Sequence, residues 1–265
     1  MDFHTNVEGG VPASAPSLAN LHSATGRTAS PGMAQSPCAT CTVRHLCLPG
    51  DLDDKSRRPL EALTIGRRRM RKGQKIFREG DGFQFIYAVR MGTVKTTVAL
   101  HDGHEQVTSF HLPGDLVGFD GVADGSHPTT AMALDNAEVC AIPYIQLMEA
   151  CGDVKPLRYR VAQLMALQLV RDFRSLKLVA GRGSEQRVAG FLLQMSGWMK
   201  DRGYSAREFQ LRMSRADIGS YLGTALETVS RTLSAFARRG FITVRHRRIE
   251  LLQPQELLMH VDKGE

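Results

Sequence analysis

The sequence lacks any run of eighteen or more apolar residues among its 265 residues, so it predicts no helix that crosses a membrane. Its first six residues, Met1 to Asn6, have neither the basic end nor the apolar stretch of a secretory signal peptide. We therefore expect a cytoplasmic protein that does not associate with membranes.

Enzyme signatures are also missing. The chain has no nucleophile elbow, no P-loop and no dinucleotide-binding fingerprint, and its nine histidines are scattered along the sequence. Because no set of catalytic groups is recognisable, we predict that the protein is not an enzyme.

Cysteine is scarce, with five residues in all. An odd number does not pair fully, and a reducing cytoplasm disfavours structural disulfides. Cys38, Cys41 and Cys47 have the spacing C-x2-C-x5-C, and Cys140 follows far along the chain. Thiolates spaced in this way hold a metal ion or an iron-sulfur cluster. We interpret Cys151 as an ordinary thiol, with replacement of Cys140 as its alternative role.

Lysine is absent between Arg207 and Arg248, whereas arginine is abundant there. Nine arginines stand against three acidic residues, which leaves six net positive charges in a chain whose total is +7. This concentration favours binding to a polyanion. The alternative for an isolated charge run is a solvated basic face. An electron carrier would have no use for such a segment.

Large apolar side chains are few in residues 1–36, which are rich in Gly, Ala, Ser, Thr and Pro. We expect this segment to be a disordered tail, because it buries too little surface to offset the entropy of ordering. The rest of the chain is long enough for about two domains. Residues 60–70 are predicted to form a short helix.

Residues 71–143 consist of short apolar or β-branched runs between turn residues, which is typical of a small all-β sandwich or barrel. Strands are predicted over residues 85–89, 94–100, 107–111 and 138–142. Residues 156–179 contain no glycine or proline after Pro156 and repeat apolar residues at helical spacing, so they predict one long helix. Its apolar stripe packs either on its own subunit or on a second copy. A further amphipathic helix is predicted over residues 184–201.

Residues 214–240 show the pattern of a helix-turn-helix. Ser214 to Asp217 form a capping box for a first helix that stops at Gly223, and Thr224 to Glu227 form a second capping box for a helix that ends at Gly240. In this motif the second helix lies in the major groove of double-stranded DNA. Two strands around residues 245–248 complete a winged motif.

The second helix carries a candidate set of base-reading residues. Glu227, Ser230 and Arg231 share one solvent face near its start. Arginine pairs with guanine, glutamate accepts from cytosine, and serine contacts several base edges. Capping of its own helix is an equally weighted alternative for Glu227. We add further candidate DNA contacts on the helices and at the wing, where phosphates are met: Thr228, Arg215, Arg245, Arg247 and Arg248.

These motifs resemble those of a known family. CATCTVRHLC (38–47), HLPGDLVGFD (111–120), EVCAIPY (138–144) and GTALETVSR (223–231) are similar to motifs of the fumarate and nitrate reduction regulators, the FNR family of the cyclic AMP receptor superfamily. The resemblance covers the chain after its N-terminal tail.

The resemblance implies an α+β fold with an N-terminal cyclic-nucleotide-binding-like β-roll, a long dimerisation helix and a C-terminal winged helix-turn-helix. The division expected on this basis is a tail (1–36), an iron-sulfur ligand segment (37–59), a β-roll sensor domain (60–154), a dimerisation helix (155–181) and a DNA-binding domain (182–265).

The resemblance also implies a mechanism. An oxygen-labile 4Fe-4S cluster on Cys38, Cys41, Cys47 and Cys140 would keep the protein a DNA-binding homodimer. Glu227, Ser230 and Arg231 would read each half of a palindrome resembling TTGAT-N4-ATCAA. Members of the family activate or repress anaerobic genes and contact RNA polymerase, for which the loop near Asp102 and Gly103 is a candidate.

Two other regulators on the same fold remain as alternatives. Structural zinc suits four cysteines, but zinc sites usually show two close cysteine pairs, and the second pair is absent here. A cyclic-nucleotide sensor needs a cation for the phosphate, and no arginine occurs between Arg90 and Arg158. We therefore favour the cluster and expect no cyclic nucleotide.

Overall fold

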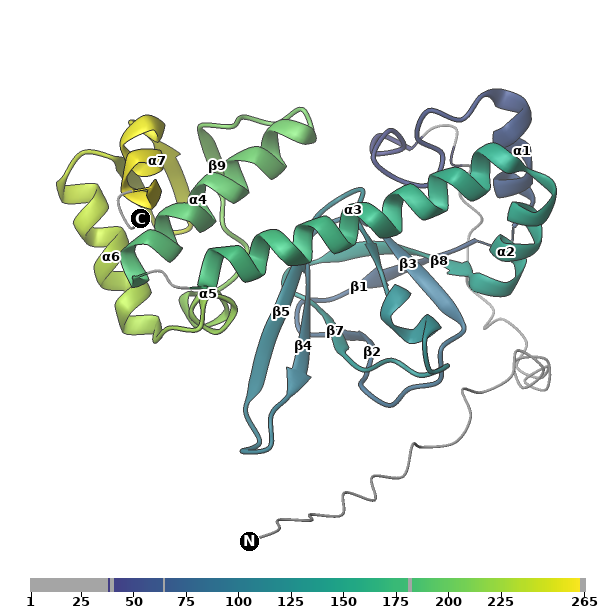
Figure 1. Cartoon of the computed structure of the whole chain (residues 1–265), viewed down its shortest axis with the longest axis horizontal. Coiled ribbons are helices and arrows are strands. Elements are labelled where there is room, and N and C mark those ends of the chain that lie inside the picture. The colour runs from purple at the N-terminus through teal and green to yellow at the C-terminus, as the bar shows by residue number, and fades with distance from the viewer. Residues whose placement is uncertain (1–37, 39–40, 64, 181–182, 263–265) are drawn as a thin grey trace, which may run out of the picture.

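The computed structural model describes residue 38 and residues 41–63, 65–180 and 183–262. The predicted N-terminal tail lies outside these residues. Two bodies are joined by one long helix: a β-roll and a smaller C-terminal domain of helices α4 to α7 (Figure 1). This arrangement is the predicted α+β fold.

The β-roll consists of two four-stranded antiparallel sheets. Their strand orders are β1-β8-β3-β6 and β2-β7-β4-β5. Short apolar side chains from both sheets, such as Val89, Val94, Ala131 and Val139, fill the space between them. The strand bounds are Gly66–Met70 (β1), Lys75–Phe77 (β2), Phe85–Met91 (β3), Val94–Ala99 (β4), Glu105–His111 (β5), Leu116–Val117 (β6), Thr130–Ala133 (β7) and Ala137–Pro143 (β8), with the 3-10 turn Phe119–Val122 (η3) after β6.

The helix predicted over residues 60–70 is wrong in its second half. Helix α1 spans Asp54–Ala62, and Gly66–Met70 forms the edge strand β1. This strand pairs along its whole length with β8, so that Arg67 lies opposite Cys140. Backbone hydrogen bonds to β8 therefore stabilise a strand at Gly66–Met70, although the local sequence favours a helix.

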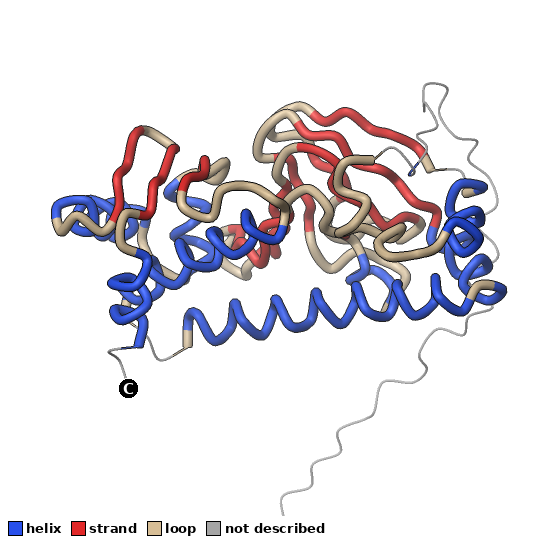
Figure 2. Tube along the Cα trace, turned by 90° about the horizontal axis from the view of Figure 1, so that it is seen from above, coloured by secondary structure: helices blue, strands red, loops and turns tan. Residues whose placement is uncertain are grey.

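Helix α3 (Lys155–Val179) follows the short helix α2 (Tyr144–Asp153) and confirms the predicted long helix. Figure 2 shows it running beside the β-roll and reaching the C-terminal domain. Only Leu157, Val161 and Leu178 on α3 are buried. Several large apolar side chains of the same helix are exposed to solvent: Tyr159, Met165, Leu167, Leu169, Val170, Phe173 and Leu176.

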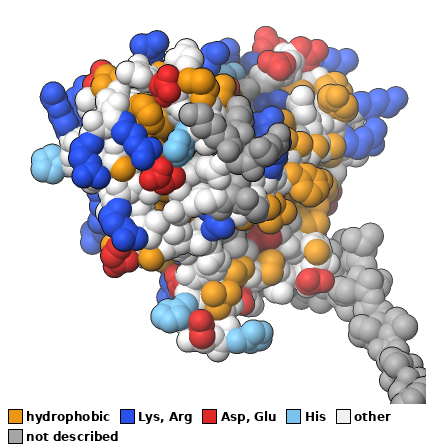
Figure 3. All heavy atoms as spheres, turned by 60° about the vertical axis from the view of Figure 1, so that its left-hand side comes forward, with side chains coloured by type: hydrophobic (Ala, Val, Ile, Leu, Met, Phe, Trp, Pro, Cys, Tyr) orange, Lys and Arg blue, Asp and Glu red, His pale blue; other side chains and the backbone are white. Residues whose placement is uncertain are grey.

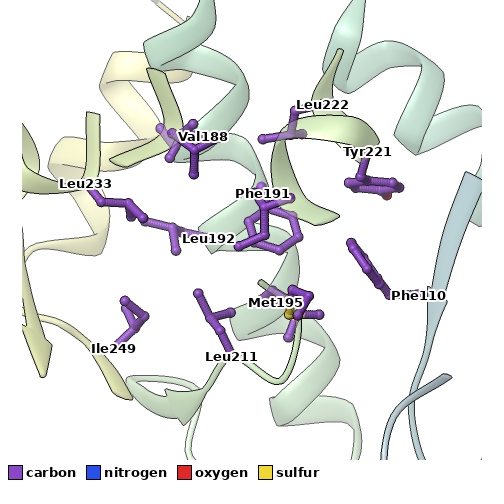
Figure 4. Packing of buried hydrophobic residues seen from close by; sticks show 14 of the residues in the cluster. Phe110, Val188, Phe191, Leu192, Met195, Leu211, Tyr221, Leu222, Leu233 and Ile249 are labelled. Atoms are coloured by element: carbon purple, nitrogen blue, oxygen red, sulfur yellow. The ribbon is translucent and has the colours of Figure 1, made fainter. Parts of the chain in front are cut away.

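The C-terminal domain has its own apolar core, built on α4, α5 and α6. Phe191, Leu192 and Met195 of α4 lie at its centre, and Phe110 of the β-roll reaches into it toward Tyr221 (Figure 4). The element bounds are Ser184–Asp201 (α4), Glu208–Gln210 (β9), Arg215–Leu222 (α5), Leu226–Arg238 (α6), Ile242–Arg245 (β10), Arg248–Leu251 (β11) and Pro254–Asp262 (α7). Strands β9, β10 and β11 form a third sheet, of which β9 was not predicted.

His111, at the end of β5, is a buried histidine whose ring is held near Thr96, with Nε2 3.4 Å from the Thr96 hydroxyl. Burial lowers the pKa of His111 from 6.5 to about 4. The charged groups that act on the ring are, in order of effect, Asp115, Arg171, Asp120 and Arg202. The folded protein therefore holds this histidine neutral at pH 7.

We predict that His111 makes the fold acid-sensitive. The unfolded chain takes up this proton near pH 6.5, whereas the folded chain does so only near pH 4, so stability falls as the pH falls through that window. Between pH 7 and pH 5 the wild type should lose about 2 kcal/mol more than His111→Gln. Urea unfolding of both proteins at the two pH values measures the difference, and parallel losses would contradict the prediction.

Candidate functional site

The four predicted cysteine ligands lie around one small cavity between the N-terminal turn segment and the β-roll. Cys38, Cys41 and Cys47 lie on successive turns, and Cys140 lies in the middle of β8, opposite Arg67 on one side and Ala88 on the other. All four line the same cavity, together with apolar residues such as Leu48, Leu60 and Ile142. Cys151 is buried in α2 and does not line it.

The environment of the sulfur atoms is apolar, and the thiols affect one another. Burial raises the pKa of Cys47 to about 12 and that of Cys140 to about 11, and it also raises the pKa of Cys38. The other cysteines of the set raise these values further. Four thiolates at this place therefore need a cation to offset their charge, which iron or zinc supplies.

Two observations bear on which group the cysteines fit. Within the described residues, no three His, Cys, Asp or Glu side chains are arranged to hold a single metal ion. A zinc ion with 2.3 Å bonds would require its sulfur ligands to be about 3.8 Å apart. In a 4Fe-4S cluster each thiolate binds a different iron, so four cysteines match its ligand number without all approaching one ion. The cavity that the four cysteines line has a volume of ≈ 30 Å³.

Two arginine side chains, Arg90 and Arg67, act electrostatically on Cys140. Arg90 donates to the buried carboxylate of Glu138 at 2.6 Å, and its charge, with that of Arg67, lowers the pKa of Cys140 against the effect of burial. Arg67 Nε lies 3.6 Å from the same carboxylate. Fixed positive charges near a thiolate set favour its ionised form. Sequence reasoning missed both arginines, because nothing in their spacing relates them to the cysteines.

Arg160 of α3 attaches the turn segment to the long helix. Its guanidinium donates from Nε and Nη2 to the carbonyl oxygen of Cys47, at 3.2 and 2.9 Å, and from Nη2 to that of His45 at 3.1 Å. A side chain at Gly50 would lie within 2.7 Å of this guanidinium. The segment that carries three of the cysteines is thus bonded directly to α3.

The helix-turn-helix is formed as predicted, with one difference. Ser214 caps α5 through the predicted capping box with Asp217, and Gly223 ends the helix in a left-handed conformation with φ 60°. The second capping box is wrong, because α6 begins at Leu226 with Ala225 as its N-cap and no side-chain capping bond. Thr224 instead belongs to the tight turn, where its carbonyl would lie 2.6 Å from any Cβ at Gly219.

The candidate base-reading residues share the free face of α6. Glu227 and Arg231 are exposed and Ser230 is half-buried. The N-cap of α6 is Ala225 and not Thr224, so Glu227 does not hold the place that the predicted capping box gave it. This weakens the alternative that Glu227 only caps its own helix. Arg231 Nη2 lies 3.2 Å from the Thr228 hydroxyl, an exposed contact within the helix that the sequence did not indicate.

The predicted phosphate contacts divide into two groups. Arg245 and Arg247 are exposed at the wing, and Arg215 is half-buried near the charge of Arg247, with burial as the main cause of its lowered pKa. Arg248 is instead ion-paired with Glu208 of β9, so its charge is already partly matched. His246, with φ 56°, forms the turn between the wing strands. Figure 3 shows Lys and Arg side chains spread over this end of the molecule and a band of apolar side chains at its right.

None of the described helices has both the length and the apolar composition that are needed to span a lipid bilayer.

Comparisons with known proteins agree with this architecture. Residues 67–153 match the family model of the cyclic nucleotide-binding domain, and residues 186–259 match that of the Crp-like helix-turn-helix domain. The solved structure of FixK2 from Bradyrhizobium japonicum superposes with a TM-score of 0.69 at 32% identity, covering 74% of this chain and 97% of that one.

Similar sequences have regulator names. The fumarate and nitrate reduction regulatory protein of Vibrio cholerae is 38% identical over 83% of this chain and 88% of its own length. The protein of the same name in Escherichia coli is 37% identical over 81% and 86%, and the transcriptional activator Anr of Pseudomonas protegens is 38% identical over 84% and 91%. The chain therefore belongs to the fumarate and nitrate reduction regulator family of the CRP/FNR superfamily, whose members are DNA-binding transcription regulators and not enzymes.

Proposed function

We propose that this protein is an oxygen-responsive transcription regulator of anaerobic genes, in which a 4Fe-4S cluster on Cys38, Cys41, Cys47 and Cys140 controls dimerisation and DNA binding. The observation that carries the proposal is the convergence of these four thiols on one cavity, from two parts of the chain that are far apart in sequence. The relatives that are named anaerobic regulators support the same function.

The bound cluster would supply a reaction with oxygen that removes the link between the four thiolates. Arg160 of α3 donates to the carbonyl oxygens of His45 and Cys47. Cys140 on β8 would bind the cluster from the side of the β-roll. If the cluster is lost, the segment stays attached by the hydrogen bonds from Arg160 to these carbonyl oxygens and by the packing of Leu48 in the apolar core.

The proposed dimer forms through α3. Met165, Leu169, Phe173 and Leu176 recur at intervals of three or four residues, so they share one face of the helix. Phe173 is 59% exposed and Leu176 62%, a large apolar surface that a second α3 would cover. The polar residues Gln168 and Arg171 interrupt a perfect heptad pattern, which suits a dimer that dissociates when the cysteine segment changes.

Each subunit would read one half of a palindrome resembling TTGAT-N4-ATCAA. The base contacts are assigned to Glu227, Ser230 and Arg231, and the backbone contacts to Thr228, Arg215, Arg245, Arg247 and Arg248. A dimer doubles the contacted surface, and binding free energies at separated half-sites add roughly. The exposed tip of the β4–β5 hairpin at Asp102 and Gly103 is the proposed contact with RNA polymerase.

Sedimentation velocity of matched anaerobic and air-exposed samples tests the proposal. The anaerobic protein should contain iron and sulfide and sediment mainly as a dimer that binds the palindrome, and the air-exposed protein should sediment mainly as a monomer. Phe173→Glu is the matched variant, because it should remain monomeric in both samples while keeping its iron. Identical mass distributions of the two wild-type samples would exclude dimerisation as the switch.

Two rivals on this fold are separated by simple measurements. A zinc protein would be colourless, whereas the proposed cluster absorbs broadly in the visible range and bleaches in air. A nucleotide sensor would bind cyclic AMP tightly in calorimetry. Against it, the carboxylate of Asp120 pairs with His127 at 3.2 Å and accepts from the Thr129 hydroxyl. A half-buried carboxylate in that stretch would repel a phosphate.

A further inference from the structure

Asp115 lies where three parts of the molecule meet. Its carboxylate is 3% exposed and is bonded to Arg171 of α3 and to Arg202 Nη2, at 2.7 Å, of the C-terminal domain. Its second oxygen accepts from the backbone N–H of Leu112 at 2.8 Å, which closes the turn Leu112–Asp115 between β5 and β6. One carboxylate therefore joins the β-roll, the long helix and the DNA-binding part of the chain.

Arg202 binds two residues of this turn, Pro113 and Asp115. It follows α4 directly, its side chain is 2% exposed, and it donates from Nε to the carbonyl of Pro113 at 2.8 Å. A third bond, from Nη1 to the carbonyl of Trp198 at 2.8 Å, holds the guanidinium against its own helix. Buried charge pairs of this kind fix geometry, because removal of one partner leaves the other charge uncompensated.

The cysteine segment covers the same turn. Gly114 has φ 96°, and a Cβ there would lie 2.6 Å from the Cβ of Leu46, so Leu46 packs directly on the turn. His45, Leu46 and Arg160 share a cavity of ≈ 160 Å³ with Asp115 and Arg171. Leu46 is the residue before the proposed ligand Cys47. A residue that packs on the turn of Asp115 therefore belongs to the segment that the thiols would hold.

Further contacts between the C-terminal domain and the β-roll fix the position of that domain. Lys95 of β4 pairs with Asp217 at 2.7 Å, in the first turn of α5. The Ser220 hydroxyl accepts from the backbone N–H of Val107 at 2.8 Å. The rings of Phe110 and Tyr221 lie 5.1 Å apart (Figure 4). Helix α6 follows α5 across a tight turn, so the position of α5 on the β-roll determines the orientation of the base-reading face of α6.

We propose that the Asp115–Arg202 pair is a positioning contact through which the cysteine segment sets the orientation of the DNA-binding domain within each subunit. This inference rests on the proposed function and adds to it a second output, independent of dimerisation. While Leu46 covers the turn, the pair stays buried and strong. When the segment withdraws, water reaches Asp115, the attraction weakens severalfold, and the DNA-binding domain is released from its fixed seat.

The first arm of the test does not depend on a cluster. Amide hydrogen exchange is measured on the full-length chain at residues 202–204, whose N–H groups bond to Met199 and Lys200 at the end of α4. Leu46→Ala and Arg202→Gln should each speed exchange there by about tenfold, and Arg202→Lys should restore part of the protection. Lys200→Gln, which removes an exposed charge two residues away, should have no effect. All samples are compared at matched iron content.

The second arm measures the ratio of the operator Kd in air to that under anaerobic conditions. In Arg202→Gln this ratio should fall about tenfold, with iron content and the dimer fraction at wild-type levels. An unchanged ratio, or exchange at residues 202–204 that does not respond to Leu46→Ala, would overturn the inference. Wild-type protein without iron would instead refute the proposed function, and the first arm would still decide whether Leu46 acts on Arg202.

Discussion

Cys140→Ala, purified anaerobically, is expected to contain iron and sulfide only at background level and to bind the palindrome about a hundredfold more weakly than the wild type. Cys140 is the one ligand that lies on the β-roll, in the middle of β8. Without it, the three thiolates of the turn segment have no anchor on the sheet. The cluster, and with it the link of the segment to β8, should therefore be lost.

The matched control is Cys151→Ala, which removes a thiol that is also buried, 4% exposed, but lies in α2 away from the cavity. This variant should keep its iron, its visible absorption and its DNA affinity. Iron and sulfide assays with fluorescence anisotropy on a labelled operator measure both outcomes. Full iron content in Cys140→Ala together with loss in Cys151→Ala would mean that Cys151 is the fourth ligand.

Arg231→Ala should relax sequence discrimination by the anaerobic dimer at the guanine that Arg231 contacts. A bidentate contact of arginine with guanine contributes about 1–3 kcal/mol to discrimination against a wrong base. The dimer makes this contact at both half-sites, so the loss should be about 4 kcal/mol, on the order of a thousandfold in Kd. Arg231 is exposed on the free face of α6 and held only by the Thr228 hydroxyl, so its removal should leave the fold intact.

Arg238→Ala is the matched control, because Arg238 is an exposed arginine in the last turn of the same helix. It should weaken binding mildly and equally on all sequences, as expected for a phosphate contact. Titrations with the palindrome, with a palindrome changed at the guanine and with unrelated DNA separate the two effects. If Arg231→Ala weakened binding equally on all three, Arg231 would be a backbone contact and not a base reader.

Much of the secondary structure could be predicted because its signals are local. Helix α4 has the predicted bounds, and the turn glycines Gly223 and Gly240 both have positive φ, at 60° and 73°. Alternating residues predicted β4, and helical spacing predicted α3. Prediction failed where a distant partner decides the structure: β1 exists because β8 offers it an unpaired edge, and the start of α6 is fixed by the packing of its turn on Gly219.

The candidate site shows the same division. The cysteine spacing identified three thiols and the family resemblance supplied Cys140, but neither gave any indication of Arg90, Arg160 or Glu138, since these residues lie on other elements and act through space. Asp115 lies in the motif HLPGDLVGFD, but no local pattern relates it to Arg202. Their pairing joins residues that are far apart in the chain, and it becomes visible only when the Leu112–Asp115 turn and the end of α4 are brought together.

The sequence by itself determined the kind of protein, because thiol spacing, a helix-turn-helix pattern and clustered arginines are short-range features that residue types carry directly. Only the tertiary structure decided which side chains surround the thiols, how the turn segment is bonded to α3, and what holds the DNA-binding domain against the β-roll. Those relations depend on burial and on distances between remote segments, and both quantities arise only when the chain is packed.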